Sequence, residues 1–237
     1  KSHQLEFIKN GIYMDMTLLA GLAVIHIVAL MSPGPDFAII VKMATQQTRL
    51  TALYCALGIA VAILIHTFLS LMGISVMIQQ SHVAFMAVQL IGSSYLAWMG
   101  YGALKSAITS IISKRRNSDM PSMQQNVAKA ALISSLKGFK IGLYTNLLNP
   151  KALIFFITLF SVLITPQVNY QTKIAATVLL FVLSLAWFSL LALILSKPRV
   201  QQKLLAANTI IDLLVGVIFI AVAVTITNNI IHQIISQ

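Results

Sequence analysis

The residues best suited to chemistry form a short stretch, Ser32-Pro33-Gly34-Pro35-Asp36, inside a long apolar segment. Each proline lacks a backbone N–H and clashes with the preceding turn, so an α-helix cannot run through the stretch. A helix broken within a membrane leaves backbone groups unpaired, which is tolerated only where the break is buried in protein or lines a wet cavity. Asp36 adds an ionisable group, and a charge at this depth indicates a functional site.

A second break lies in the other half of the chain, at Asn146-Leu147-Leu148-Asn149-Pro150-Lys151. Asn149 followed by Pro150 is typical of a helix start, with asparagine as N-cap and proline at the first helical position. Ser32-Pro33 or Gly34-Pro35 can start a half-helix in the same way. Each start presents free N–H groups and a partial positive charge, so two starts facing one cavity would favour a carboxylate.

The two charges at these breaks have ordinary explanations as well as functional ones. Asp36 can be a simple helix-start charge, because the helix dipole favours an anion in the first turn. Lys151 is more informative, because the same dipole disfavours a cation there. The lysine could extend to the membrane surface, but the flanking residues are apolar. We therefore expect Lys151 to need a partner, either Asp36 or a substrate carboxylate.

Two histidines, His26 and His66, lie in the middle of separate apolar segments. A lone histidine in such a place is most often a hydrogen-bonded packing residue, and we favour that interpretation. The alternatives are that they line the substrate cavity or carry protons.

The composition is that of an integral membrane protein. Of 237 residues, 58% are hydrophobic and only 9% are charged, against about 25% charged in soluble domains. The net charge of +11 would suggest nucleic acid binding in a soluble protein, but the basic residues gather in short loops, which favours membrane topology. No nucleic acid partner is therefore expected. The one cysteine excludes a disulfide within the chain.

Six apolar segments account for most of the chain. A bilayer core requires about 20 apolar residues per helix. Four segments fit this length directly, and the first and fourth are longer and interrupted, as pairs of half-helices would be. The segments cover approximately 16–44, 52–78, 83–104, 138–164, 174–195 and 209–227. The predicted fold is therefore an all-α integral membrane protein with six transmembrane helices, of which helices 1 and 4 are broken.

The basic residues predict the orientation of these helices. Three connections on one side contain Lys42, Arg49, Lys105, Lys114, Arg115, Arg116, Lys129, Lys137, Lys140, Lys197, Arg199 and Lys203. The opposite side has only Lys1, Lys9 and Lys173. The basic side is expected to face the cytoplasm, which places both termini outside.

The chain divides into two halves of three spans, each opening with a broken one. Because three is odd, the halves enter the membrane from opposite sides, as in the inverted repeats of many secondary transporters. The predicted organisation is an N-terminal extension or cloning remnant at 1–15, a first repeat at 16–104, a cytoplasmic linker at 105–128 and a second repeat at 129–237. Met14 and Met16 are candidate natural starts.

Several motifs resemble those of the LysE/RhtB family of amino-acid exporters over about residues 16–225. They are Ser32-Pro33-Gly34-Pro35-Asp36, Gly58-Ile59-Ala60, Tyr95-Leu96-Ala97-Trp98-Met99-Gly100 and Thr145-Asn146-Leu147-Leu148-Asn149-Pro150-Lys151-Ala152. The segments 26–31 and 185–188 are similar to the threonine/homoserine exporter branch. The resemblance implies a multi-pass efflux protein of the bacterial inner membrane, thought to be driven by the proton gradient.

The preferred function is therefore secondary export of a small neutral amino acid, with threonine or homoserine first. The expected partners are this substrate, protons and the lipid bilayer, and a homo-oligomer is compatible with them. One alternative is a metal-cation exporter using His26, His66 and Asp36, although carboxylates and cysteines are few. A second is a membrane-embedded enzyme or maturation factor. No catalytic residue, metal site or cofactor is expected, since the sequence has no phosphate-binding loop and no nucleophile motif.

The predicted binding or coupling residues come from both breaks and from the two histidines. They are Ser32, Pro33, Gly34, Pro35, Asp36, Asn146, Asn149, Pro150, Lys151, His26 and His66.

Overall fold

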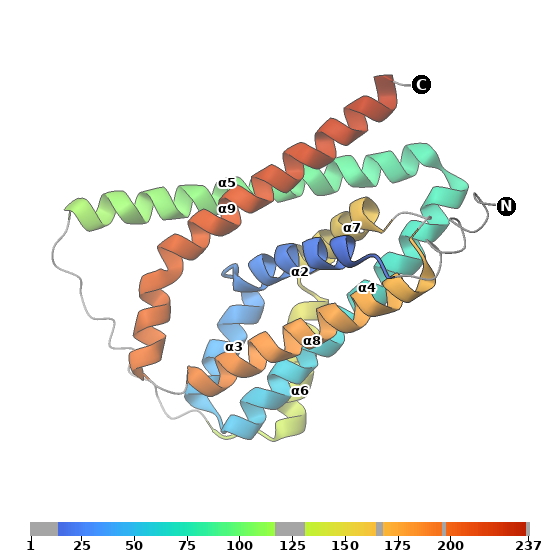
Figure 1. Cartoon of the computed structure of the whole chain (residues 1–237). Coiled ribbons are helices and arrows are strands. Elements are labelled where there is room, and N and C mark those ends of the chain that lie inside the picture. The colour runs from blue at the N-terminus through green and yellow to red at the C-terminus, as the bar shows by residue number, and fades with distance from the viewer. Residues whose placement is uncertain (1–13, 117–130, 165–167, 196–197, 236–237) are drawn as a thin grey trace.

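The computed structural model describes residues 14–116, 131–164, 168–195 and 198–235. Over these residues the chain is entirely helical, without strands (Figure 1). The helices are α2 (Met16–Met31), α3 (Pro35–Gln46), α4 (Arg49–Gln80), α5 (His82–Arg116), α6 (Ser135–Leu147), α7 (Pro150–Leu163), α8 (Tyr170–Ile194) and α9 (Pro198–Ile235).

The described helices account for six membrane spans. Four are long and apolar enough to cross a bilayer by themselves, at Arg49–Gly73, Val83–Ile112, Tyr170–Ile194 and Thr209–Gln233. The other two spans are bent pairs: α2 and α3 meet at 60°, and α6 and α7 meet at 59°. Both bends fall at the proline-containing stretches, where the helix loses backbone hydrogen bonds. The predicted fold class, with helices 1 and 4 broken, is confirmed.

Helix pairing between the halves follows the inverted-repeat plan. Helix α2 runs parallel to α8, because residues near their starts bond to each other, Asp15 N to Thr172 Oγ1 at 3.0 Å, and His26 pairs with Ser184 further along. Helix α6 runs parallel to α4 in the same manner. Each half-helix that opens a repeat thus packs beside the middle span of the other repeat. The last spans, α5 and α9, form an antiparallel pair (Figure 1).

The linker region is partly helical. Helix α5 continues to Arg116, so the first half of the stretch expected at 105–128 extends the third span. The remainder of that linker, and residues 1–13 of the N-terminal extension, lie outside the described residues. Asp15, the last residue of the predicted extension, caps α2 by accepting a hydrogen bond from the Leu18 N–H at 2.9 Å.

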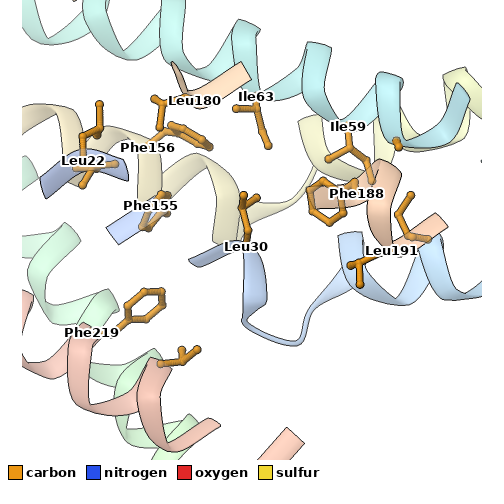
Figure 2. Close-up of a cluster of buried hydrophobic side chains, with 14 of the residues drawn as sticks. Leu22, Leu30, Ile59, Ile63, Phe155, Phe156, Leu180, Phe188, Leu191 and Phe219 are labelled. Atoms are coloured by element: carbon orange, nitrogen blue, oxygen red, sulfur yellow. The ribbon is translucent and has the colours of Figure 1, made fainter. Parts of the chain in front are cut away.

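The buried core gathers around helix α7 (Figure 2). Phe155 and Phe156 project from α7 toward side chains of α2, α4, α8 and α9, including Leu30, Ile63 and Phe219. Since lipid is as apolar as these residues, helix association in a membrane depends on close packing more than on hydrophobic burial. Aromatic rings of α7 thus pack among the mostly aliphatic side chains of the neighbouring helices.

Glycines allow α4 and α6 to approach each other closely. A Cβ atom added at Gly58 would overlap the backbone carbonyl oxygen of Phe139, and one added at Gly142 would overlap that of Cys55. Backbone is the obstacle at both positions, so no side-chain movement can relieve the overlap. This contact fixes the position of α6, which ends at the second break.

We expect Gly58→Ala to destabilise the protein by about 1–3 kcal/mol, because even one methyl group overpacks this contact. Gly102→Ala is the matched control, since an added Cβ there meets nothing within 4 Å, and alanine in a helix gains about 0.5–1 kcal/mol over glycine. Thermal unfolding of the detergent-purified variants measures the difference. A Gly58→Ala melting temperature at or above that of Gly102→Ala would contradict the close-packing role.

Candidate functional site

The first break begins where α2 ends at Met31 and Ser32 serves as its C-cap. Helix α3 then starts at Pro35, with Gly34 as N-cap in an extended backbone conformation. Of the two starts that the sequence allows, Gly34-Pro35 is therefore the one adopted. The first turn of α3 contains Asp36, at the end of the helix where the dipole stabilises an anion.

The second break repeats this design with a side-chain cap. Helix α6 ends at Leu147, and α7 starts at Pro150. The Asn149 side chain accepts a hydrogen bond from the Lys151 backbone N–H at 3.0 Å. This confirms that Asn149-Pro150 starts a half-helix with asparagine as N-cap.

Asp36 is held by side chains from the other half of the chain. Its Oδ2 accepts hydrogen bonds from Asn146 Nδ2 at 3.0 Å and from Asn149 Nδ2 at 3.1 Å. Its Oδ1 is buried and has no hydrogen-bond partner. One carboxylate oxygen therefore joins the two breaks, and the other retains its capacity to accept hydrogen bonds.

Lys151 also reaches across to the opposite break. Its ammonium donates to Ser32 Oγ at 2.6 Å and to the Pro33 carbonyl at 3.2 Å. The expected partner was Asp36 or a substrate carboxylate, but no Asp36 oxygen forms an ion pair with Lys151 within 4.0 Å in this conformation. Asp36 Oδ2 is already engaged by the two asparagines, and the Lys151 ammonium lies at the C-terminal end of α2, where the helix dipole favours a cation.

A cavity lies between the two breaks. Its volume is about 50 Å³ for the centres of water-sized molecules, several times the roughly 10–15 Å³ that a single water requires. Its polar lining comes from Ser32, Asp36, Asn146, Asn149, Lys151 and His26. The remaining lining is apolar and includes Phe155 and Phe156 of α7, Phe188 of α8 and Phe219 of α9, which are labelled in Figure 2. Most of the polar groups of the cavity thus come from the two breaks, and phenylalanine rings form much of its remaining wall.

The two histidines lie beside the cavity, as part of its wall or against it. His26 is 1% exposed, and its Nε2 lies 2.8 Å from Ser184 Oγ on α8. His66 is 2% exposed, and its Nε2 donates to the Asn146 carbonyl at 3.2 Å. Both rings face Phe156, with centroids 5.8 Å away in each case. His26 lines the cavity, whereas His66 contacts it only through Phe156 and Asn146.

The structure brings most of the predicted residues together. Gly34 also lines the cavity, and Pro33 enters through its carbonyl oxygen. Pro35 and Pro150 start the half-helices, and neither is part of the cavity lining. The sequence analysis missed Ser184 and the four phenylalanines. Nothing distinguishes these phenylalanines in the sequence from others in apolar segments, because only helix rotation determines which ones face the cavity.

The family described as LysE type translocator matches residues 27–229, a range that contains both breaks. The chain is 31% identical to the threonine efflux protein of Escherichia coli strain K12 over 204 residues, covering 86% of this chain and 94% of that protein.

Two further relatives extend the comparison. The threonine efflux protein of Salmonella typhimurium is 30% identical over 204 residues, with the same coverage of 86% and 94%. An uncharacterized membrane protein of Haemophilus influenzae is 26% identical over 218 residues, covering 92% of this chain and all of that protein. No solved structure matches the chain significantly.

Proposed function

Because the chain belongs to the LysE-type translocator family, we propose that it is a secondary exporter of small neutral amino acids driven by the proton gradient. Threonine and homoserine are the first candidate substrates. The family supports transport of a small molecule across a membrane, and two relatives are named for threonine efflux.

The observation that carries the proposal is that each break supplies one charged side chain, of opposite sign, which forms hydrogen bonds to the other break. Asp36 on α3 is bonded to Asn146 and Asn149, and Lys151 on α7 is bonded to Ser32 and Pro33. Both charged groups line one cavity. An amino acid carries one ammonium and one carboxylate group, so this pair of charges complements both ends of the substrate backbone.

The proposed roles follow from the hydrogen bonds that remain available. Asp36 Oδ1 is unpartnered and would accept from the substrate ammonium or take up a proton. The Lys151 ammonium would bind the substrate carboxylate, and the N–H groups at the start of α7 would assist it. Protonation of Asp36 would weaken its hold on the ammonium, because a neutral acid attracts a cation less strongly. Proton entry would thus be coupled to substrate release.

Neither alternative function is favoured by a specific observation. Metal export would need several histidine, cysteine or carboxylate ligands in one place, and no group of three is found among the residues that the structure describes. A membrane-embedded enzyme would need a reactive group. Asn149 instead caps α7, and Asp36 Oδ2 accepts hydrogen bonds from Asn146 and Asn149, so these groups link the two breaks. We propose no catalytic step.

Transport by the purified protein tests the proposal. In proteoliposomes loaded with labelled threonine or homoserine, we expect efflux that depends on the protein and accelerates when the outside is acidified. Protein-free liposomes are the control. Absence of amino-acid efflux together with efflux of a divalent cation would replace this proposal by the metal alternative.

We further propose that the protein lies in the bacterial inner membrane with both termini outside. In Figure 1 the connection between α3 and α4 and the start of α6 lie at one end of the bundle, and the turn between α4 and α5 lies at the opposite end. Gln47 bonds to Ala131 and Ile133, which ties the first two of these regions together. Basic residues near that end support a cytoplasmic location for it.

A pair of single cysteines checks this orientation. In a Cys55→Ala background, we expect Ser81→Cys to react with an impermeant thiol reagent added to intact cells, and Thr48→Cys to react only after permeabilisation. Both positions are exposed, so accessibility within the protein is matched. Rapid labelling of Thr48→Cys in intact cells, with Ser81→Cys protected, would invert the proposed topology.

A further inference from the structure

The hydrogen bonds of His26 determine which of its ring nitrogens carries the proton. The hydroxyl of Ser184 has one hydrogen, and it donates to the Leu180 carbonyl at 2.7 Å. With that hydrogen on the Leu180 carbonyl, the 2.8 Å contact between Ser184 Oγ and His26 Nε2 is a hydrogen bond in which the hydroxyl oxygen accepts, and this assignment satisfies both contacts of Ser184. Nε2 consequently carries the hydrogen, and Nδ1 of the neutral ring is an acceptor.

That second nitrogen, Nδ1, has no partner. It is buried without any hydrogen bond, in a residue that is 1% exposed and lines the cavity. The nearby wall is aromatic, with Phe155 and Phe156 rings at centroid distances of 6.3 and 5.8 Å. A buried acceptor left unpaired is unfavourable, and Phe155 and Phe156 carry no donor for it. Such an acceptor is suited to a ligand with a hydroxyl group.

We propose that His26 Nδ1 accepts a hydrogen bond from a hydroxyl on the substrate side chain, and that this contact makes the site selective for hydroxylated amino acids. The inference rests on the proposed export function and assigns a specificity-determining residue to that same cavity. Ser184 is a positioning residue, because it acts by fixing the proton of His26 on Nε2.

A small hydroxy amino acid can meet both groups. His26 and Lys151 line the same cavity, and the Lys151 ammonium is bound to Ser32 at the end of α2. A ligand that contacts both residues needs a carboxylate for the ammonium and a hydroxyl for Nδ1, and threonine and homoserine carry both groups.

Two further unpartnered acceptors of the cavity lining lie at its charged end, whereas His66 Nδ1, which is also buried and unpartnered, belongs to a residue outside the lining. Asp36 Oδ1 and Asn146 Oδ1 are both buried without partners, and both residues belong to the hydrogen-bonded junction between the two breaks. They are placed to receive the three N–H groups of an ammonium. His26 is on the middle of α2, away from that junction, so a separate donor of the substrate is needed to reach it.

Exchange measurements with isosteric substrate pairs test the inference. Proteoliposomes are loaded with labelled alanine, which has no hydroxyl, and exchange is driven by threonine or valine, and by homoserine or norvaline. We expect the wild type to favour the hydroxylated member of each pair by about ten- to a hundredfold, because the member without a hydroxyl leaves His26 Nδ1 without a hydrogen bond.

Variants locate the preference at His26. His26→Leu should bring the ratio of exchange with the hydroxylated substrate to exchange with its isostere close to one for both pairs. His26→Gln should restore part of the preference, since its amide offers a donor and an acceptor. Ser184→Ala should lower the ratios severalfold by releasing the proton from Nε2. Gln89→Leu is the control, because Gln89 is another buried residue with an unpartnered acceptor but lies outside the cavity lining. This variant should keep the wild-type preference for hydroxylated substrates.

The outcomes separate the two proposals. Alanine exchange without any hydroxyl preference in the wild type, or an unchanged preference in His26→Leu, would overturn this inference and leave the export function standing. If His26→Leu does not accumulate, an unchanged preference in Ser184→Ala overturns it instead. No exchange of any amino acid by the wild type would overturn the proposed function and this inference with it.

Discussion

Replacing Asp36 by asparagine is expected to leave the protein folded and to abolish the dependence of export on the proton gradient. The asparagine oxygen can accept the same two hydrogen bonds that Asp36 Oδ2 receives from Asn146 and Asn149. The junction between the breaks therefore survives, while the group that takes up a proton is lost. Substrate exchange should persist at an affinity about ten- to a hundredfold lower, because a hydrogen bond to a charged group is removed.

The measurement compares efflux from proteoliposomes with and without acidification of the outside. Asp15→Asn is the control, since Asp15 caps the start of α2 by accepting from the Leu18 N–H at 2.9 Å and does not line the cavity. This variant should keep gradient-driven export. If Asp36→Asn remains fully gradient-driven, Asp36 is a helix-start charge only, and proton coupling resides in another group.

The second large effect is expected at Lys151, where glutamine should weaken the binding of the substrate carboxylate. The glutamine amide can still donate hydrogen bonds to Ser32 and to the Pro33 carbonyl, so the contact between α7 and the end of α2 is retained. What disappears is the positive charge that would bind the substrate carboxylate. Losing a charged hydrogen bond in a partly buried site corresponds to about 1.5–3 kcal/mol, or ten- to a hundredfold in affinity.

Binding and exchange of labelled threonine by the reconstituted variant check this expectation. Lys140→Gln is the control, because Lys140 is an exposed lysine on α6, outside the cavity lining, and its loss should leave binding unchanged. A Lys151→Gln variant that binds threonine as the wild type does would mean that Lys151 serves only to link the breaks, and that the helix N-terminus alone holds the carboxylate.

The sequence by itself determined the breaks, the half-helices that they create and the number of spans. These features depend on local chemistry: Pro35 and Pro150 cannot continue a helix, Asn149 supplies its own cap, and the lengths of the apolar segments match a bilayer. Asp36 and Lys151 could therefore be assigned to the first turns of α3 and α7 before the fold was considered.

Only the tertiary structure decided which side chains meet. The sequence analysis favoured packing roles for His26 and His66 and paired Lys151 with Asp36 or a substrate. In the fold Lys151 bonds to Ser32 and Pro33, and Asn146 and Asn149 bind the carboxylate. Such contacts depend on the rotation of each helix about its axis. In a soluble protein an amphipathic pattern would indicate that rotation, but spans that are apolar on every side, against lipid that is equally apolar, carry no such pattern.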